Sequence, residues 1–419
     1  MDAIRCQTER VPAASPDDHA RVVVTGIGAD GWDGLSSAAR DAIGAAEVLL
    51  GSDRQLGLVP DSVAAFRRAW PSPLLPALPL LLAEYRGVRL CVLASGDPMC
   101  YGIGGSLVRL LGADAVRVIT HPSSVSLACA RLGWAIEDVD VVSTAGRPLS
   151  LLYPVLQPGR RVLVLVGTET AASAIADLLA SRGFGPSAMT VLTRLGAADE
   201  TVVAGRAFSW LGEPHDPLAI VAIEARLAPG AVALARTTGL PDDAYEHDGQ
   251  ITKREIRAIT LSALAPSPGQ VLWDVGAGSG SVGIEWMRAH PANRAVAIER
   301  DETRAARIAV NAERLGVPGL QVVTGAAPEA LAGLPRPDAV FVGGAVCLPG
   351  VIDVALAALR PGGRLVANGV TVETETVLAG WHAKLGGGLT RVAVQRAAPV
   401  GGFTGWRPAM PVTQWIFRI

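Results

Sequence analysis

The segment Val271–Glu285, VLWDVGAGSGSVGIE, holds the residues whose types and spacing predict chemistry most strongly. Its apolar start leads into Asp274, and alternating glycines follow before a helix-like stretch begins. Glycine tolerates a positive φ and lets a ligand approach the backbone, because it has no Cβ. The first turn of a helix adds free N–H groups that bind polar ligands. The glycines of this turn are Gly276, Gly278 and Gly280.

A carboxylate stands at the end of the next apolar run. Ala295–Ile298 leads into Glu299, which is placed to bind the two hydroxyls of a ribose. The pattern resembles the S-adenosylmethionine (SAM) site of Rossmann-like methyltransferases. Two alternatives are a turn that serves packing alone and an NAD site, although NAD sites follow GxGxxG and this turn reads GxGxG. The resemblance assigns cofactor contacts to Asp274, Gly276, Ala277, Gly278, Ser279, Gly280 and Glu299.

Two later loops complete the predicted C-terminal site. Gly325, Ala326 and Ala327 follow the next apolar run, and we expect them beside the adenine. Gly343 and Gly344 follow the run after that, where the substrate cleft should open. Both positions fit the rule that open α/β sheets bind ligands beyond the carboxyl ends of their strands.

The whole segment from about Asp243 to Ile419 resembles the decarboxylating C15-methyltransferases of cobalamin biosynthesis. Besides the glycine turn, the motifs that carry the resemblance are DGQITKREIRAITLSAL, GAAPEAL, FVGGA and LRPGGRLVANGVTVETE. The resemblance implies that Thr252 lies at the SAM site. Many relatives carry an acid where this chain has Ala326, so we expect no side-chain contact to adenine there.

A second glycine pattern, GIGADG, follows the apolar run Arg21–Thr25. Its glycines Gly26, Gly28 and Gly31 spell GxGxxG, and Glu47 follows as a candidate ribose acid. Alone, these residues predict NAD and a dinucleotide-dependent oxidoreductase. A lone GxGxxG is a weak pattern, so the neighbouring motifs must decide.

Those motifs, ASGDPMCYG and PSSVSL, together with VVTGIGADG, resemble the tetrapyrrole methylase family over roughly residues 21–226. Members are two-lobed α/β proteins that bind SAM between the lobes. By this resemblance the loop at Gly28 faces the substrate. Asp97 has a second interpretation, because Gly-Asp-Pro also forms turns. The SAM contacts that the resemblance implies are Ser95, Gly96, Asp97, Ser123 and Ser124.

The two resemblances together imply a bifunctional, decarboxylating SAM-dependent methyltransferase of corrin-ring biosynthesis. It would methylate C5 and C15 of precorrin-6B, using two SAM sites, and remove the carboxylate of the C12 acetate to give precorrin-8X. Methyl transfer from a sulfonium needs alignment and exclusion of water, so neither a nucleophile nor a metal is expected. An RNA or another small metabolite is the alternative substrate for a SAM methyltransferase fold.

A tetrapyrrole carries many carboxylates, so arginines should line both clefts. Arg147, Arg194 and Arg254 lie near motif loops, although each could equally be a solvated surface cation. Tyr245 and His247 precede the Thr252 segment and, with Asp97, are the candidate catalytic residues; His247 could instead have no catalytic role.

The elements that must position these residues alternate between apolar runs and helical patterns, which predicts α/β architecture throughout. We expect a flexible tail at 1–20, a two-lobed tetrapyrrole methylase fold at 21–228, a linker at 229–242 and a Rossmann-like SAM methyltransferase domain at 243–419. The predicted strands are Arg21–Thr25, Val48–Leu50, Leu90–Ala94, Val116–Ile119, Val139–Val142, Val162–Val166, Thr190–Leu192, Leu218–Ile223, Val271–Val275, Ala295–Ile298, Gln321–Val323, Ala339–Val342, Arg364–Ala367, Thr390–Gln395 and Thr413–Arg418.

The composition agrees with a two-domain enzyme. Of 419 residues, 50% are hydrophobic and 18% are charged, which allows large cores. A net charge of −2 gives no electrostatic case for a nucleic acid or a membrane surface as partner. Five scattered cysteines without a CxxC pair fit a reducing cytoplasm, and the longest apolar patch, Leu74–Ala83, is too short to span a bilayer. The resemblance also implies a homo-oligomer.

Overall fold

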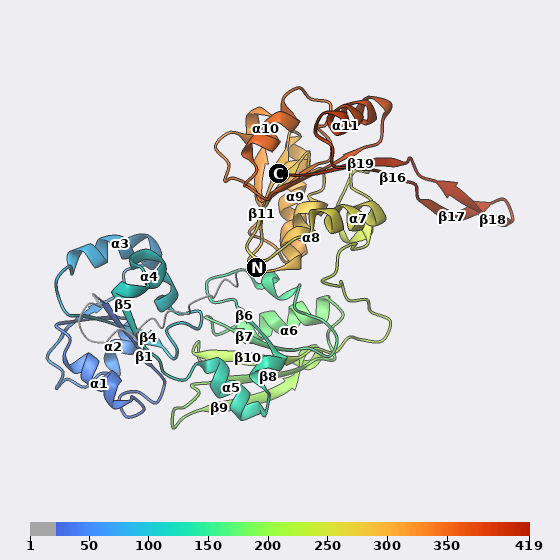
Figure 1. Ribbon diagram of the computed structural model, residues 1–419. Coiled ribbons are helices and arrows are strands. Elements are labelled where there is room, and N and C mark those ends of the chain that lie inside the picture. The colour runs from blue at the N-terminus through green and yellow to red at the C-terminus, as the bar shows by residue number, and fades with distance from the viewer. Residues whose placement is uncertain (1–21) are drawn as a thin grey trace, which may run out of the picture. The chain divides into compact units, whose positions relative to one another are not determined.

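The computed structural model describes residues 22–419, so the tail expected at 1–20 lies outside the described residues. The chain folds into two compact units (Figure 1). Unit 1 runs up to Ala145 and also takes in Arg161–Glu224, whereas unit 2 takes Gly146–Arg160 and Ala225–Ile419. Both units are mixed α/β, as predicted, and the finer domain boundaries stay predictions.

The first lobe of unit 1 is a parallel sheet of five strands with helices on both faces. Its strands are β1 (Val22–Ile27), β2 (Val48–Gly51), β3 (Phe66–Ala69), β4 (Leu90–Ser95) and β5 (Val116–Ile119), and its helices are α1 (Ser37–Gly44), α2 (Asp53–Gly57), α3 (Leu74–Glu84) and α4 (Ile103–Leu111). The strand order is β3-β2-β4-β1-β5. Helices α1 and α2 pack in one apolar cluster, and α3 and α4 pack in another on the opposite face. The central strands are therefore buried on both sides, which explains their continuous apolar runs.

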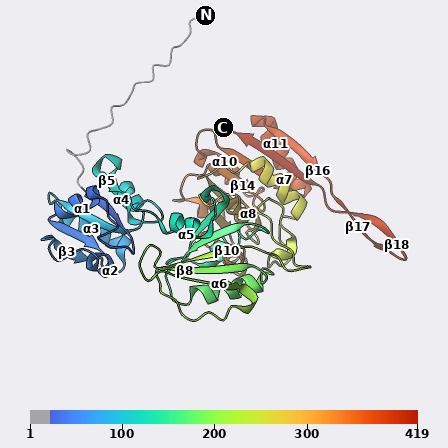
Figure 2. The ribbon, with the colours of Figure 1, turned by 90° about the horizontal axis from the view of Figure 1, so that it is seen from below.

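The second lobe of unit 1 is a mixed sheet. Its strands are β6 (Val139–Ser143), β7 (Arg161–Leu165), β8 (Ala188–Thr193), β9 (Thr201–Arg206) and β10 (Ala219–Glu224). They lie in the order β6-β7-β10-β8-β9, with the β6–β7 pair parallel and the other pairs antiparallel. Figure 2 shows α5 (Ser124–Leu132) and α6 (Ala171–Ser181) on opposite sides of this sheet. Unit 1 thus has the two lobes that the motifs predicted.

Unit 2 is built on a seven-stranded sheet in the order β13-β12-β11-β14-β15-β19-β16. The strands are β11 (Val271–Val275), β12 (Arg294–Glu299), β13 (Gln321–Thr324), β14 (Ala339–Val342), β15 (Arg364–Gly369), β16 (Gly388–Val392) and β19 (Val412–Arg418). The strands from β13 to β15 are parallel, while β19 is antiparallel to both of its neighbours. The strand order reverses between the neighbouring strands β11 and β14. Open α/β sheets bind ligands at such a point.

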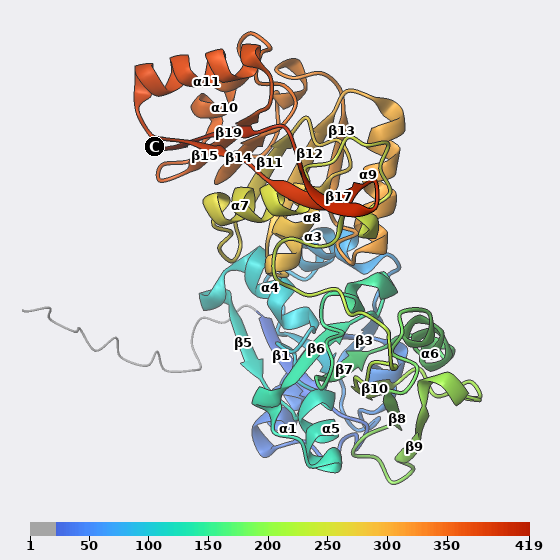
Figure 3. The same ribbon diagram turned by 90° about the vertical axis from the view of Figure 1, so that its right-hand side faces the viewer.

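Helices cover both faces of this sheet (Figure 3). One face packs against α7 (Arg254–Leu264), α8 (Ser281–Ala289) and α9 (Glu302–Arg314). The other packs against α10 (Val351–Ala358) and α11 (Val372–Leu385). Successive residues of β11 belong to different clusters, as the two-residue period of a strand requires.

Several elements differ from the prediction. The edge strand β3 and the short helix α2 gave no apolar run to find, and β9 was missed although it contains the short run Val202–Ala204. The strand expected at Thr390–Gln395 overlaps β16 but has the wrong bounds. The chain instead ends β16 at Val392 and forms a hairpin of β17 (Gln395–Val400) and β18 (Phe403–Pro408). Gly401 and Gly402 make its two-residue turn. The apolar patch at Leu74–Ala83 forms α3, and within residues 22–419 no helix is long and apolar enough to cross a membrane.

Candidate functional site

The GxGxG turn of unit 2 connects β11 to α8 and depends on glycine. Gly276, Gly278 and Gly280 have φ between +59° and +75°. A Cβ on Gly276 would lie 2.9 Å from the backbone nitrogen of Gly344, and one on Gly278 would lie 3.0 Å from the carbonyl oxygen of Gln250. The turn therefore packs between the loop after β14 and the segment that precedes α7.

Glu299, at the end of β12, faces this turn. Its Oε2 accepts a hydrogen bond from the N–H of Gly278 at 2.8 Å, and its Oε1 accepts one from Asp301 at 3.1 Å. The N–H of Ala277 donates to the carbonyl of Ile298 at 3.1 Å, one residue earlier on the same strand. Glu299 is buried, yet each carboxylate oxygen keeps a lone pair that can accept from a ligand hydroxyl.

Asp274 lies at the end of β11, beneath the turn, and is 1% exposed. Its Oδ2 accepts from the N–H of Gly283 at 2.9 Å, while its Oδ1 has no hydrogen-bond partner among the described residues. Burial raises the pKa of this carboxyl from its ordinary 3.8 to about 7. The Gly283 hydrogen bond opposes the rise, and the charge of Glu299 adds to it. The inner end of the site thus holds a carboxyl that is only partly ionised at neutral pH.

A strap, residues 246–252, is fixed against the turn by one side chain. Asn311 of α9 is fully buried, and its Nδ2 donates to the carbonyls of Glu246 at 2.9 Å and Ser279 at 3.0 Å. Its Oδ1 accepts from the N–H of Glu246 at 2.8 Å. Ser279 is buried, and its hydroxyl has no partner within residues 22–419. Thr252 ends the strap, and its carbonyl accepts from Arg257 at 2.5 Å.

The middle of the strap is held by ion pairs. Asp248 lies 2.9 Å from Nε of Arg304 and 3.3 Å from Nη1 of Arg307, both on α9. Arg304, the N–H of Gln250 and Arg307 keep the pKa of Asp248 well below its ordinary value. His247 is half-buried and forms a local turn within the strap, where its Nδ1 accepts from the N–H of Gly249 at 3.0 Å.

The two predicted loops meet the same edge of the sheet. The N–H of Gly325 donates to the carbonyl of Glu299 at 2.9 Å, and the N–H of Gly343 donates to Val275 at 3.0 Å. Ala326 is exposed in this loop, and Ala327 is buried. The structure therefore brings the glycine turn, Glu299 and both loops together at the carboxyl ends of β11, β12, β13 and β14.

Tyr245 lies in a buried polar cluster next to the strap. Its hydroxyl donates to Oε1 of Glu285 at 2.9 Å, and the same oxygen accepts from Nε of Arg257 at 2.6 Å. Burial raises the pKa of Tyr245 well above its ordinary value, and the charge of Glu285 adds to the rise. Glu285 also accepts from the N–H groups of Gly239 and Leu240, which ties the end of the expected linker to unit 2. Tyr245 thus lies in a buried, hydrogen-bonded cluster, and its catalytic role stays a prediction.

The arginines that the sequence singled out lie apart from these contacts. Arg254 is exposed at the start of α7, and Arg147 is exposed on the segment 146–160, which belongs to unit 2. Arg194 has a left-handed φ of 51° and pairs with Asp199 at 2.7 Å and Asp216 at 3.5 Å. The charge of Arg194 is therefore already balanced.

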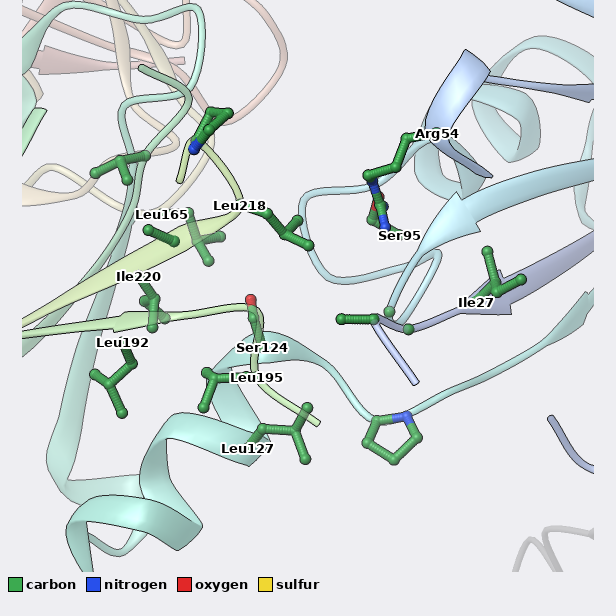
Figure 4. A pocket seen from close by; sticks show the side chains of 17 residues that line it. Ile27, Arg54, Ser95, Ser124, Leu127, Leu165, Leu192, Leu195, Leu218 and Ile220 are labelled. Carbon is green, nitrogen blue, oxygen red and sulfur yellow. The ribbon is translucent and has the colours of Figure 1, made fainter. Parts of the chain in front are cut away.

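A pocket opens between the two lobes of unit 1 (Figure 4). The first lobe contributes residues at or just beyond the carboxyl ends of β1, β2, β4 and β5, and the second lobe contributes mostly apolar side chains from α5, β7, β8 and β10. The residues that line it are Ile27, Gly28, Ala29, Arg54, Ser95, Gly96, Pro122, Ser124, Leu127, Leu165, Val166, Leu192, Leu195, Pro217, Leu218, Ala219 and Ile220.

Four of the predicted N-terminal residues line this pocket: Gly28, Ser95, Gly96 and Ser124. Ser123, their neighbour, is buried and caps α5, since its Oγ accepts from the N–H of Ser126 at 3.1 Å. Asp97 closes a turn, where its Oδ1 accepts from the N–H of Met99 at 2.8 Å. This hydrogen bond matches the turn interpretation of the Gly-Asp-Pro motif.

The first glycine loop is closed by a side-chain pair. Nε2 of His121 lies 3.1 Å from Oδ1 of Asp30, and a Cβ on Gly28 would lie 2.6 Å from that Nε2. Glu47, the candidate ribose acid, precedes β2 and pairs with Arg89 instead. A ribose acid belongs at the carboxyl end of the second strand, so the assignment of Glu47 is wrong.

The polar corner of the pocket contains a residue that the sequence analysis missed. Nη2 of Arg54 donates to Oγ of Ser95 at 2.7 Å, and Nε2 of Gln55 donates to the same oxygen at 3.0 Å. Arg54 follows β2 directly, in the sequence GSDRQL, so its place after the second apolar run was a signal for the carboxyl edge.

Comparisons with known proteins cover both units. Residues 21–209 match Tetrapyrrole (Corrin/Porphyrin) Methylases, and residues 243–418 match the Precorrin methyltransferase domain. A precorrin-6Y C(5,15)-methyltransferase [decarboxylating] of a Sinorhizobium species is 50% identical over 94% of this chain and 95% of its own length. The chain belongs to the precorrin-6Y C(5,15)-methyltransferase (decarboxylating) family.

Other relatives agree. A protein of the same description from Mycobacterium tuberculosis is 46% identical over 94% of this chain and 98% of its own length. The crystal structure of the C-terminal domain of precorrin-6Y C5,15-methyltransferase from Rhodobacter capsulatus is 45% identical, covers 44% of this chain and 100% of that chain, and has a TM-score of 0.42. The resemblance inferred from the motifs is confirmed, and the chain is a SAM-dependent C-methyltransferase of cobalamin biosynthesis rather than an oxidoreductase.

Proposed function

We propose that this chain methylates precorrin-6B at C5 and C15 and removes the carboxylate of the C12 acetate, giving precorrin-8X, with one SAM site in each unit. One observation supports the proposal: a single chain contains two separate arrangements that could bind a ligand, each at the carboxyl edge of parallel strands. One is the pocket of unit 1, and the other is the GxGxG turn of unit 2. The N-terminal site would act at C5, and the C-terminal site at C15 and on the carboxylate.

The residues of the C-terminal site fit SAM. Gly276 and Gly278 leave backbone space that a Cβ would fill, and Glu299 keeps lone pairs for ribose hydroxyls. Asp274 adds an unpaired buried oxygen. SAM, when bound, supplies an electrophilic methyl group on its sulfonium. We propose that the remaining cofactor contacts come from Ala277, Ser279, Gly280, Thr252, Gly325, Ala326 and Ala327, with Gly343, Gly344 and Arg254 toward the substrate.

The protein's own part in this chemistry is alignment and exclusion of water. The strap is fixed to the turn through Asn311, so it covers one side of the cofactor site with a rigid segment. No side chain is needed as a nucleophile, because the meso carbons of a reduced tetrapyrrole are enamine-like. The conjugated macrocycle can itself accept the electrons released by decarboxylation.

The pocket of unit 1 fits the same chemistry with a different fold. Its second-lobe wall is apolar, which suits the faces of a macrocycle or an adenine, and polar groups gather at Ser95. We propose SAM contacts from Ser95, Gly96, Asp97, Ser123 and Ser124, with Gly28 toward the substrate.

Product analysis tests this division of labour. Gly276→Ala adds a Cβ 2.9 Å from the backbone of Gly344. In Gly269→Ala the alanine also has to adopt a positive φ, but its Cβ lies in open space. With precorrin-6B and SAM, mass spectrometry should show that Gly276→Ala loses decarboxylation and C15 methylation, while Gly269→Ala retains both. Full turnover by Gly276→Ala, or wild-type protein that gains no methyl group, would contradict the proposal.

We also propose that the protein is a homo-oligomer, as the family resemblance implies. The β17–β18 hairpin projects from the body of unit 2 (Figure 1). Three of its apolar residues are largely exposed to solvent: Val400 by 61% of its surface, Phe403 by 84% and Trp406 by 72%. A cluster of exposed large apolar side chains is typical of an interaction surface, which supports contact with a second copy.

A further inference from the structure

Arg54, a cation in the pocket of unit 1, has no role in the function proposed above. It lies on α2, just beyond the carboxyl end of β2, and its guanidinium points toward Ser95 at the edge of the cavity (Figure 4). Within residues 22–419 it forms no ion pair. Burial lowers the pKa of Arg54, and the charge of Asp216 opposes that effect.

The surroundings of Arg54 favour an anionic ligand. The opposite wall is made of Leu127, Leu165, Leu192 and other apolar side chains, which offer the charge no partner. A partly buried charge without a partner is costly, so binding of an anion there is favoured. Asp216, the nearest carboxylate that affects it, is already paired with Arg194.

Ser95 adds a second donor to this corner. Its Oγ accepts from both Arg54 and Gln55, which uses both lone pairs of the hydroxyl. Gln55 is itself held in place, because its Oε1 accepts from the N–H of Ser52 at 2.8 Å in a capping box. The hydroxyl proton of Ser95 is therefore free to donate to a ligand, beside the remaining N–H groups of the guanidinium.

We propose that Arg54 and the hydroxyl of Ser95 form a carboxylate-binding site that positions the ligand for C5 methylation. The proposal rests on the function proposed above. A guanidinium and a neighbouring hydroxyl match the two oxygens of a carboxylate. The carboxylate has two possible sources, the amino-acid end of SAM and an acetate or propionate side chain of the tetrapyrrole.

The test compares Arg54→Gln with Arg54→Lys in the full-length protein. Arg109→Gln is the matched control, because Arg109 lies on α4 of the same lobe and donates to Ser106 one turn away. Two binding titrations are made for each protein, one with S-adenosylhomocysteine (SAH) and one with precorrin-6B in the presence of SAH. C5 methylation is followed separately from C15 methylation, which unit 2 should carry out unchanged in every variant, and circular dichroism checks that unit 1 is folded.

If the carboxylate belongs to SAM, Arg54→Gln should bind SAH about 10- to 100-fold more weakly at one site, the range of a charge-assisted hydrogen bond. If the carboxylate belongs to the tetrapyrrole, SAH binding by Arg54→Gln should be unchanged. The variant should then bind precorrin-6B more weakly by that factor, and its KM for C5 methylation should rise by the same factor. Arg54→Lys should recover part of the loss, and Arg109→Gln should match the wild type.

Wild-type affinity of Arg54→Gln for both ligands would overturn the inference. A wild-type protein that transfers no methyl group would contradict the proposed function instead. The titrations do not depend on turnover, so in that case weaker binding by Arg54→Gln would still support the carboxylate site.

Discussion

Asp274 and Glu299 show how two carboxyl groups of one site acquire different properties from their surroundings. Glu299 accepts from two backbone N–H groups, whereas Asp274 accepts from one and keeps a bare oxygen. Burial raises the pKa of Asp274 to about 7. Its protonation changes within the physiological range, which makes the C-terminal unit sensitive to pH.

We predict that Asp274→Asn flattens the pH dependence of stability. The folded protein keeps this proton up to about pH 7, while the unfolded chain releases it near 3.8, so the folded state binds more protons between these values. The free energy of unfolding should therefore fall as pH rises through this window and level off above it. Asparagine has no such proton to lose.

Scanning calorimetry from pH 4.5 to 8 checks this prediction, because the other titrating groups are common to both proteins. The Tm of Asp274→Asn minus the Tm of the wild type should increase as pH rises. A difference that stays constant with pH would show that Asp274 does not carry the effect.

The sequence predicted these site residues where a local rule applied and missed them where packing decided. The alternating glycines and Glu299 could be predicted. A positive φ favours glycine, and Glu299 directly follows an apolar run that predicts a strand. The burial of Tyr245 against Glu285 could not, since the two residues meet only through tertiary packing. The role of Arg54 also depends on two strands that are distant in sequence, and Ser95 belongs to the second of them.

At the scale of elements, the strap is the part of the C-terminal site that depends most on a single contact. Asn311 makes three hydrogen bonds that join residue 246 to the glycine turn. Removing that side chain leaves the buried carbonyl of Ser279 and two part-buried backbone groups of Glu246 without partners, and a buried group left unsatisfied costs about 1–3 kcal/mol.

We predict that Asn311→Ala loosens the strap and lowers the free energy of unfolding of unit 2 by about 3 kcal/mol. Asn293→Ala is the control, because Asn293 is also buried but donates only to the carbonyl of Trp286. Hydrogen exchange of a peptide covering residues 246–252 should become faster in Asn311→Ala and stay as in the wild type in Asn293→Ala. Equal protection of this peptide in both variants would contradict a strap held by Asn311.

The predictability of elements followed their burial. Strands β11 and β14 have the bounds that the sequence predicted, because parallel strands covered on both faces show as continuous apolar runs. The edge strand β9 was missed although it contains the short apolar run Val202–Ala204, and it is exposed along its whole length. The hairpin β17–β18 was missed for the same reason, since most of its side chains face solvent.

At the scale of the whole molecule, one chain combines two folds with unrelated sheet orders, and we propose that each of them supplies a site. Unit 1 uses two lobes around a pocket, and unit 2 uses a turn between neighbouring parallel strands. We expect the exposed hairpin of unit 2 to serve assembly rather than either site, because its apolar side chains lie on a projecting arm.

We predict that replacing Phe403 and Trp406 together by serine lowers the oligomeric state without loss of methyl transfer to C5. Burial of such side chains stabilises an interface by about 25 cal/mol per Å² of apolar surface, so their loss should weaken assembly. Sedimentation equilibrium measures the mass, and Leu211→Ser, another exposed apolar residue but in unit 1, is the control. Wild-type mass in the double variant would exclude the hairpin as the contact.

The central claim is that this one chain contains two SAM sites, and the most direct measurement is the stoichiometry of SAH binding to the full-length protein by isothermal titration calorimetry. We predict two molecules of SAH per chain in the wild type and in Gly269→Ala, and one in Gly276→Ala. One molecule per wild-type chain, or two in Gly276→Ala, would contradict the account.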